Sequence, residues 1–243
     1  MTETIRTNSD TLTIEVWSDV ACPFCYLGEQ NLELALESFA HRDQVEIVAR
    51  SFELDPTAPV GEHRPMVEAL AEKFGTSPAQ VAAMQRGIAE RAKAAGLAYD
   101  TSDAQITNTF DAHRLVHLAA ESGKGMELLR ALMQGYFAEG LRAGDPEALV
   151  AVARRVGLDE TRVREVLAGD DYADAVRADQ QRARSIGVSG VPFFLIADRY
   201  ALSGAQPVAT FASALDQAWA AEHPIQVIGD ADGAVCTDDS CAI

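Results

Sequence analysis

Long apolar runs are missing from this 243-residue sequence. No stretch approaches the length of a transmembrane helix, and the first ten residues are polar and lack the apolar core of a secretory signal. We therefore expect neither a membrane-spanning nor a secreted protein, and we expect the chain to act in the cytoplasm.

Positive charge and cysteine are also scarce. Lysine and arginine total 20 against 37 aspartates and glutamates, a net charge of −17 that would repel nucleic acid and anionic membranes. Only four cysteines are present, and in a reducing compartment such pairs indicate catalysis, redox sensing or metal binding more often than structural disulfides. Otherwise the composition, 48% hydrophobic and 23% charged, is that of a globular protein with one large domain, or with a domain that carries a sizeable insertion.

Two of the cysteines, Cys22 and Cys25, form a Cys-x-x-Cys motif between an apolar strand-like run and a helical pattern. At a helix start, unpaired N–H groups and the positive end of the helix dipole favour the thiolate of the first cysteine. Pro23 suits the first helical turn, which needs no backbone donor. The second cysteine, about one turn on, can close a disulfide or release a substrate from a mixed one.

A structural zinc site is the alternative for these cysteines, since Cys236 and Cys241 supply a second pair. Zinc pairs usually lie on turns within one compact module, whereas these pairs are separated by most of the chain. The sequence therefore favours redox chemistry, and we expect no metal ligands.

The order of predicted elements divides the chain. A strand at 11–18, a helix at 23–40 and a strand at 45–52 form a β-α-β unit with parallel strands. Strands at 193–196 and 200–203 and a helix at 207–222 form a β-β-α unit. Between the two units only helices are predicted, at 65–74, 78–95, 107–122, 126–141, 146–156, 160–167 and 171–186. The expected domains are 11–53 with 187–222, a helical insertion at 54–186, and a tail at 223–243 with a Cys-x4-Cys pair.

This arrangement resembles a thioredoxin-like α/β fold with a large all-helical insertion. The segment Gly187 to Phe193 agrees with it, because thioredoxin-like proteins carry a cis-proline loop that faces the active cysteines. The resemblance implies a cis bond at Val191–Pro192, a Val191 backbone that binds substrate, and a Pro192 without a competing N–H. The alternative is a proline that only starts an edge strand.

The insertion, the stretch WSDVACPFCYLG (17–28) and the stretch NTFDAHRL (108–115) resemble the FrnE-like branch of the DsbA family, over Leu12 to Glu222. The resemblance implies a protein disulfide oxidoreductase or isomerase, with Cys22 as the exposed nucleophile and Cys25 as the buried resolving cysteine. Pro23 and Phe24 would tune the pair. Strongly oxidising DsbA proteins have a histidine in this dipeptide, so its absence here favours a milder oxidoreductase or isomerase.

Other side chains are candidates for supporting roles. Thioredoxin-like proteins often place a buried acid in the strand before the motif, so Glu15 and Asp19 are the candidate bases for Cys25; the alternative for Glu15 is a solvated carboxylate. His113 and His117 are four residues apart, a spacing that suits a metal, but no carboxylate or cysteine motif accompanies them, which favours packing or surface roles.

Members of the FrnE-like branch include proteins with a C-terminal Cys-x4-Cys, so Cys236 and Cys241 would exchange with the active pair or be an inert exposed pair. The expected partners are protein or small thiol and disulfide substrates. No cofactor is expected, apart from glutathione as reductant or co-substrate.

Two other functions stay open. One is a glutathione-dependent isomerase or transferase of the hydroxychromene-carboxylate isomerase or kappa-class type, although those proteins carry serine where Cys22 stands. The other is a zinc-binding, redox-switched scaffold or holdase.

Overall fold

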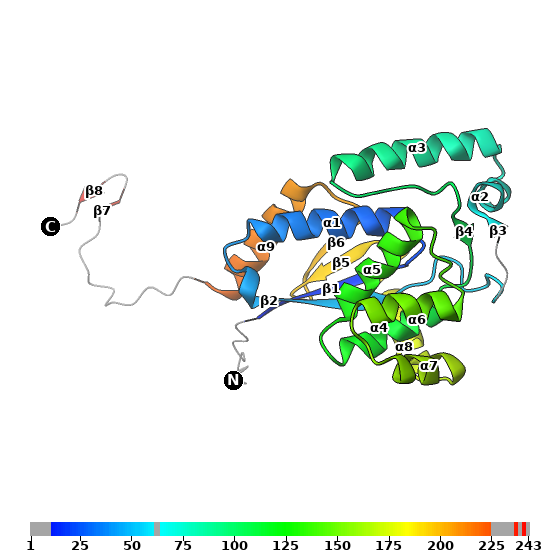
Figure 1. Ribbon diagram of the computed structural model, residues 1–243. Coiled ribbons are helices and arrows are strands. Elements are labelled where there is room, and N and C mark those ends of the chain that lie inside the picture. The colour runs from blue at the N-terminus through cyan, green and yellow to red at the C-terminus, as the bar shows by residue number, and fades with distance from the viewer. Residues whose placement is uncertain (1–10, 61–63, 225–235, 238–239, 242–243) are drawn as a thin grey trace.

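A four-stranded sheet at the centre of the computed structural model carries the cysteine motif at one end of its first strand (Figure 1). The structure describes residues 11–60 and 64–224, together with the backbone of 236–237 and 240–241. The expected wandering tail lies largely outside the described residues.

The sheet has the strand order β2-β1-β5-β6. Strand β1 pairs in parallel with β2, as the β-α-β unit predicts, and antiparallel with β5, which pairs antiparallel with β6. The strands are β1 (Leu12–Ser18), β2 (Val45–Ser51), β5 (Phe193–Ile196) and β6 (Tyr200–Ser203). The thioredoxin-like fold is therefore confirmed.

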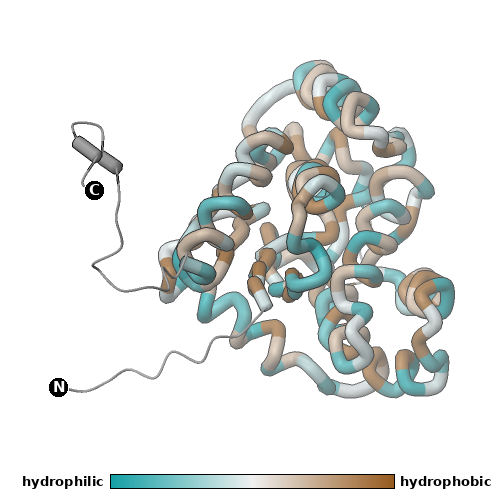
Figure 2. The backbone as a smooth tube through the Cα atoms, turned by 90° about the vertical axis from the view of Figure 1, so that its left-hand side faces the viewer, coloured by the Kyte–Doolittle hydropathy of each residue, from teal (hydrophilic) through white to brown (hydrophobic). Residues whose placement is uncertain are grey.

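Alternate residues of β1 face two different layers, because successive side chains of a strand point to opposite faces. Ile14 and Val16 pack on one face against α1 (Pro23–Glu37) and α9 (Val208–Glu222). On the other face Trp17 packs against Ala183 of α8 (Ala173–Ser185). Figure 2 shows hydrophobic segments at the centre of the body.

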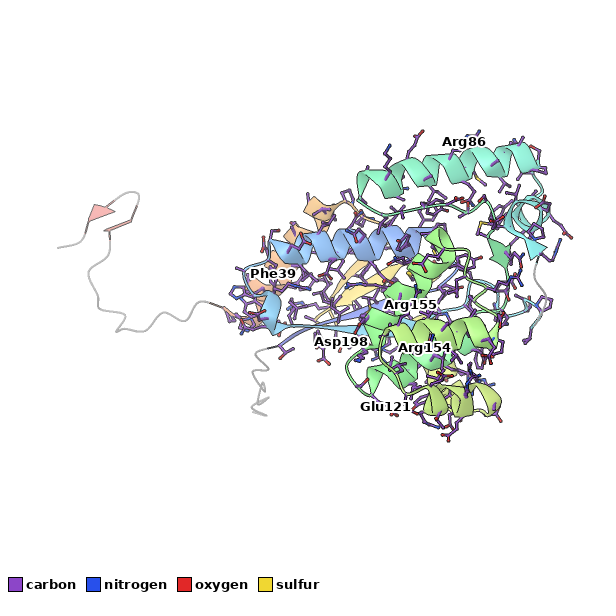
Figure 3. The ribbon with its side chains drawn as sticks, viewed as in Figure 1. Phe39, Arg86, Glu121, Arg154, Arg155 and Asp198 are labelled. Carbon is purple, nitrogen blue, oxygen red and sulfur yellow. The ribbon has the colours of Figure 1, made fainter. Side chains whose placement is uncertain are left out.

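Between β2 and β5 the chain forms a helical insertion, which lies largely to one side of the sheet, with α3 along the top of the view in Figure 1. Its other helices are α2 (Met66–Phe74), α3 (Pro78–Ala94), α4 (Phe110–Ala120), α5 (Gly125–Ala138), α6 (Pro146–Arg155) and α7 (Glu160–Ala168). Charged side chains such as Arg86, Arg154 and Glu121 lie on its outer surface (Figure 3).

The insertion also contains a short ladder that the sequence does not predict. β3 (Arg64–Pro65) pairs antiparallel with β4 (Gln105–Ile106), and the Tyr136 hydroxyl donates to the Gln105 carbonyl at 2.8 Å. Strands of two residues are too short to show a periodic pattern, so the prediction of helices alone was wrong at this point.

In residues 11–60 and 64–224, none of the helices has both the length and the apolar character that crossing a bilayer requires.

Candidate active site around Cys22 and Cys25

Cys22 is the N-cap residue of α1, and Pro23 occupies the first helical turn. The backbone of Cys22 is extended, with φ −96° and ψ 110°, so its sulfur turns back over the helix end and accepts a hydrogen bond from the Cys25 N–H at 3.3 Å. Both cysteines are free thiols. The same N–H also donates to the Cys22 carbonyl at 3.0 Å, so the Cys22 sulfur shares a backbone donor of the first helical turn.

The Val191–Pro192 segment lies directly against Cys22, although 169 residues separate the two in sequence. The Cys22 thiol donates to the Val191 carbonyl oxygen, with 3.7 Å between sulfur and oxygen, and the Val191–Pro192 peptide bond is cis. The structure thus brings together the two motifs that the sequence singled out.

Both sulfur-bearing side chains are covered. Cys22 is only 3% exposed, so the expectation of an exposed nucleophile is wrong, because the Val191 segment covers it; Cys25 is fully buried, as expected. Burial, followed by the hydrogen bond and the charge of Cys22, raises the pKa of the Cys25 thiol well above its ordinary value. Cys25 therefore holds its proton firmly in the dithiol state.

Phe24 is the exposed member of the dipeptide between the cysteines, at 40% exposure. The guanidinium of Arg91 in α3 lies over its ring, 5.5 Å from the centroid. This cation–π contact joins the insertion to the active-site turn.

The carboxylate of Asp19 fixes the turn before Cys22. It accepts hydrogen bonds from the backbone N–H groups of Ala21 (3.3 Å) and Leu54 (2.7 Å), and the His113 ring nitrogen lies 3.5 Å away. Burial alone would raise the pKa of Asp19, but His113 and the two amides outweigh it and hold this pKa below its ordinary value. An ionised carboxylate with these partners is a poor proton acceptor.

Glu29 is a buried acid that the sequence interpretation missed. It lies one turn beyond Cys25 on α1 and is 2% exposed; one oxygen accepts from the Ser18 hydroxyl at 2.7 Å, and the other has no hydrogen-bond partner among the described residues. Burial raises the pKa of Glu29 to about 7, against the opposing effects of Ser18 and Arg130. The charge of Glu29 in turn contributes to the raised pKa of Cys25.

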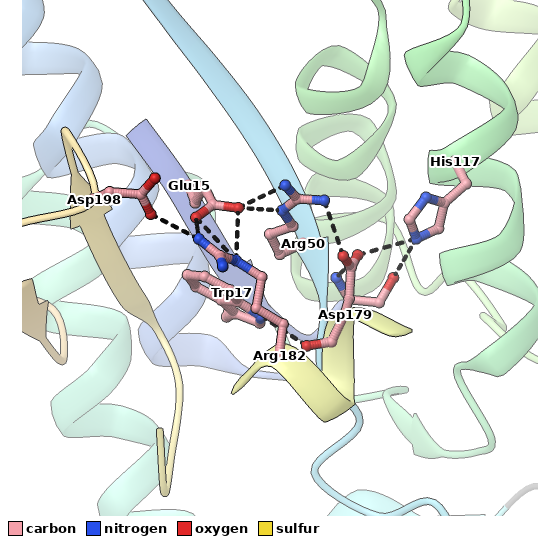
Figure 4. Close-up of polar contacts among 8 residues, drawn as sticks. Glu15, Trp17, Arg50, His117, Asp179, Arg182 and Asp198 are labelled. Carbon is pink, nitrogen blue, oxygen red and sulfur yellow. Dashed lines mark hydrogen bonds and ion pairs between the residues drawn. The ribbon is translucent and has the colours of Figure 1, made fainter. Parts of the chain in front are cut away.

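Glu15, the candidate base from the sequence, lies elsewhere. Its carboxylate is held by Arg50, 2.6 Å away, and by Arg182, which also pairs with Asp198 at 2.7 Å (Figure 4). The strand alternation puts Glu15 on the face of β1 that meets α8, whereas Ser18 and Glu29 meet on the face that carries α1. Of these two acids, Glu29 and not Glu15 contributes to the raised pKa of Cys25.

His113 and His117 do not form a shared site. His113 faces Asp19, whereas Nε2 of His117 lies 3.1 Å from both the Ser51 hydroxyl and an Asp179 oxygen (Figure 4). A Ser-His-Asp relay needs the serine and the aspartate on different ring nitrogens, so these contacts are structural. In the part of the chain that the structure describes, no group of three His, Cys, Asp or Glu side chains could hold a metal ion.

The stretch 108–115 supports the site from the insertion. Asn108 donates to the Ala58 carbonyl at 3.0 Å, His113 faces Asp19, and Arg114 donates to main-chain carbonyls at the end of α7, among them that of Val166. This stretch therefore joins the turn before Cys22 to the helices beneath it.

The backbones of Cys236 and Cys241 are paired. Cys236–Thr237 (β7) runs antiparallel to Ser240–Cys241 (β8), with Cys236 directly opposite Cys241. Directly opposite residues of antiparallel strands have their Cα atoms about 4.5–5.5 Å apart, within the range that a disulfide spans.

Comparison with known proteins places this site in a family. A probable DsbA oxidoreductase from Streptomyces coelicolor is 44% identical in sequence, and its crystal structure matches with a TM-score of 0.83 over 96% of this chain and 99% of that chain. The uncharacterized protein YwbO of Bacillus subtilis (strain 168) is 28% identical over 190 residues, which are 77% of this chain and 88% of that protein.

A 2-hydroxychromene-2-carboxylate isomerase structure also matches, with a TM-score of 0.63 at 15% identity over 88% of this chain and 100% of that chain, which shows the shared fold alone. The family model described as the DSBA-like thioredoxin domain matches residues 13–216. With its Cys22–Cys25 pair at a helix start, the chain belongs to the DSBA-like thioredoxin domain family and is a DsbA-like thiol oxidoreductase.

Proposed function

We propose that Cys22 exchanges disulfides with protein or small-molecule partners in the cytoplasm, in the manner of the FrnE-like branch. The observation that carries the proposal is the Cys22 sulfur at the start of α1, with a backbone donor from Cys25 on one side and the Val191 carbonyl on the other. The stretches 17–28 and 108–115 support the branch assignment.

In the proposed reaction the Cys22 thiolate attacks one sulfur of a substrate disulfide, and the other sulfur leaves as a thiolate. The Cys25 thiolate then attacks Cys22 and releases the substrate thiol, which leaves a Cys22–Cys25 disulfide. The second step requires a proton to leave Cys25. Glu29 is the acceptor in our proposal, because its pKa of about 7 allows both protonation states near neutral pH.

A trapping experiment tests this mechanism. In Cys25→Ala the resolving thiol is absent, so mixed disulfides through Cys22 should accumulate and be identified by mass spectrometry of non-reduced protein. The masses distinguish protein partners from glutathione. Cys22→Ala is the control and should capture nothing; equal capture by both variants, or none by Cys25→Ala, would contradict the proposal.

The tail pair is proposed as the internal partner of the active pair, supported by the opposite placement of Cys236 and Cys241 in the β7–β8 ladder. Replacing both tail cysteines by alanine should then slow the turnover of the Cys22–Cys25 disulfide when a thiol reductant is supplied. Stopped-flow kinetics of Cys22–Cys25 disulfide reduction, compared between this variant and the unaltered chain, test the proposal. Unchanged kinetics would show the tail pair to be inert.

A further inference from the structure

Gly28 occupies the point of closest approach between the cysteine helix and the segment that contains Pro192. A Cβ added to Gly28 would lie 2.9 Å from Pro192 Cγ and 3.2 Å from Phe194 Cζ. Real side-chain carbons essentially never come within 3.0 Å, so any residue larger than glycine would displace one of these neighbours.

Of the two neighbours, Phe194 has no room to move, whereas Pro192 is held through its carbonyl. Phe194 is a fully buried residue of β5, and its ring meets Phe211 of α9 edge-on, with centroids 4.8 Å apart. The Pro192 carbonyl accepts a hydrogen bond from the Gly204 N–H at 2.8 Å. A Cβ at position 28 would therefore push the proline ring away from α1 rather than be absorbed by the core.

The same junction is held from a second side. Asn31, one turn beyond Gly28, donates to the Gln206 carbonyl at 2.8 Å, and the Ala205 Cα would lie 3.5 Å from the added Cβ. Helix α1 is thus fixed against both the Pro192 segment and the turn that follows β6.

The position of the Val191–Pro192 segment affects the hydrogen bonding of Cys22. Its thiol donates to the Val191 carbonyl, one residue before Pro192, and only the dithiol form of the protein has a proton for that bond. A displaced carbonyl would remove a stabilising contact from the dithiol and none from the disulfide.

We propose that Gly28 is a positioning residue that sets the Val191–Pro192 segment against α1 and thereby sets the equilibrium between dithiol and disulfide at Cys22 and Cys25. The inference rests on the proposed thiol-exchange function, although the equilibrium itself is measurable without any physiological substrate.

The first test compares two helical glycines. Gly87 lies within α3 beside the outward-facing Arg86 (Figure 3), and a Cβ there meets nothing within 4 Å. Alanine is preferred over glycine inside helices, so Gly87→Ala should raise the denaturant midpoint. Gly28→Ala should lower it, because the clash outweighs the helix preference. If both variants become more stable, the proposed constraint does not exist.

The second test is redox equilibration with glutathione. The dithiol loses two protons and two electrons to form the Cys22–Cys25 disulfide, while one glutathione disulfide takes them up and becomes two glutathione thiols. Alkylation of the remaining thiols gives the equilibrium constant. Because Gly28→Ala would lose one weak thiol hydrogen bond, we expect its equilibrium constant to shift about threefold toward the protein disulfide. The equilibrium constant of Gly87→Ala should equal that of the unaltered chain.

A Gly28→Ala variant that is less stable but has an unaltered equilibrium constant would overturn the positioning role and leave only a packing role. If this variant does not fold, Asn31→Ala tests the same junction without added atoms and should shift the constant in the same direction. Failure of the Cys25→Ala trap would count against the exchange mechanism alone, since the glutathione equilibrium is read on the chain itself.

Discussion

Replacing Asp179 by alanine is expected to lower the free energy of unfolding by about 3–5 kcal/mol, the typical cost of removing one partner from a buried ion pair. Asp179 is 4% exposed, and its carboxylate accepts from Arg50 (3.0 Å), from the Ser51 N–H (2.9 Å) and faces His117 at 3.1 Å (Figure 4). Without the carboxylate the buried Ser51 N–H loses its acceptor, and the half-buried Arg50 guanidinium is left paired with Glu15 alone of its two carboxylate partners.

Asp174→Ala on the same helix is the matched control. Its side chain is fully exposed and, within residues 11–60 and 64–224, forms an ion pair with Arg177 alone, so the midpoint of urea unfolding should stay close to that of the unaltered chain. Asp179→Asn keeps the shape of the side chain but removes its charge, so its unfolding midpoint should lie between those of Asp179→Ala and Asp174→Ala. Equal midpoints for Asp179→Ala and Asp174→Ala would show that the network does not hold α8 to the sheet.

Replacing Glu29 by glutamine is expected to remove a pH dependence of stability. The pKa of Glu29 is raised from 4.5 to about 7 in the folded chain, so the folded state binds the proton more tightly than the unfolded state. Stability is therefore greatest below pH 4.5 and falls as the pH rises through 7, by about 3 kcal/mol for such a shift. Because glutamine carries no charge, the free energy of unfolding of Glu29→Gln at pH 8 should exceed that of the unaltered chain by the same amount.

Urea unfolding of the reduced protein at pH 5 and pH 8 measures this difference. Glu37→Gln, at the exposed end of the same helix, should keep the pH dependence of the unaltered chain. The same Glu29→Gln variant should resolve mixed disulfides at Cys22 more slowly at neutral pH, if Glu29 accepts the Cys25 proton. A pH slope identical to that of the unaltered chain would show that Glu29 is ionised in the folded protein at neutral pH.

The parts of the site that depend on local signals were predictable. Cys22, Pro23 and Cys25 lie at a strand-to-helix junction that the apolar pattern reveals, and Val191–Pro192 precedes a clear strand. The contact between Cys22 and the Val191–Pro192 segment was expected from the family resemblance and not from the apolar pattern of the sequence.

Glu29 was detectable in principle. The buried stripe of α1 runs through Cys25, Glu29, Leu32 and Leu36, a spacing of four, three and four residues. An acid on such a stripe is a candidate for a raised pKa, whereas Glu15 was chosen from its strand alone. Alternation along a strand shows which residues share a face, but the partners of Glu15 on that face, above all Arg182, lie far away in sequence.

The burial of both sulfur atoms has a consequence for the lifetime of the protein. Cysteine thiolates are oxidised by peroxide to sulfinic and sulfonic acids, which disulfide exchange does not reverse, and this damage requires an oxidant to reach the sulfur. With Cys22 almost wholly covered and Cys25 fully covered, the resting dithiol is shielded from small oxidants. Irreversible oxidation of Cys22 therefore requires the same access to its sulfur that disulfide exchange requires.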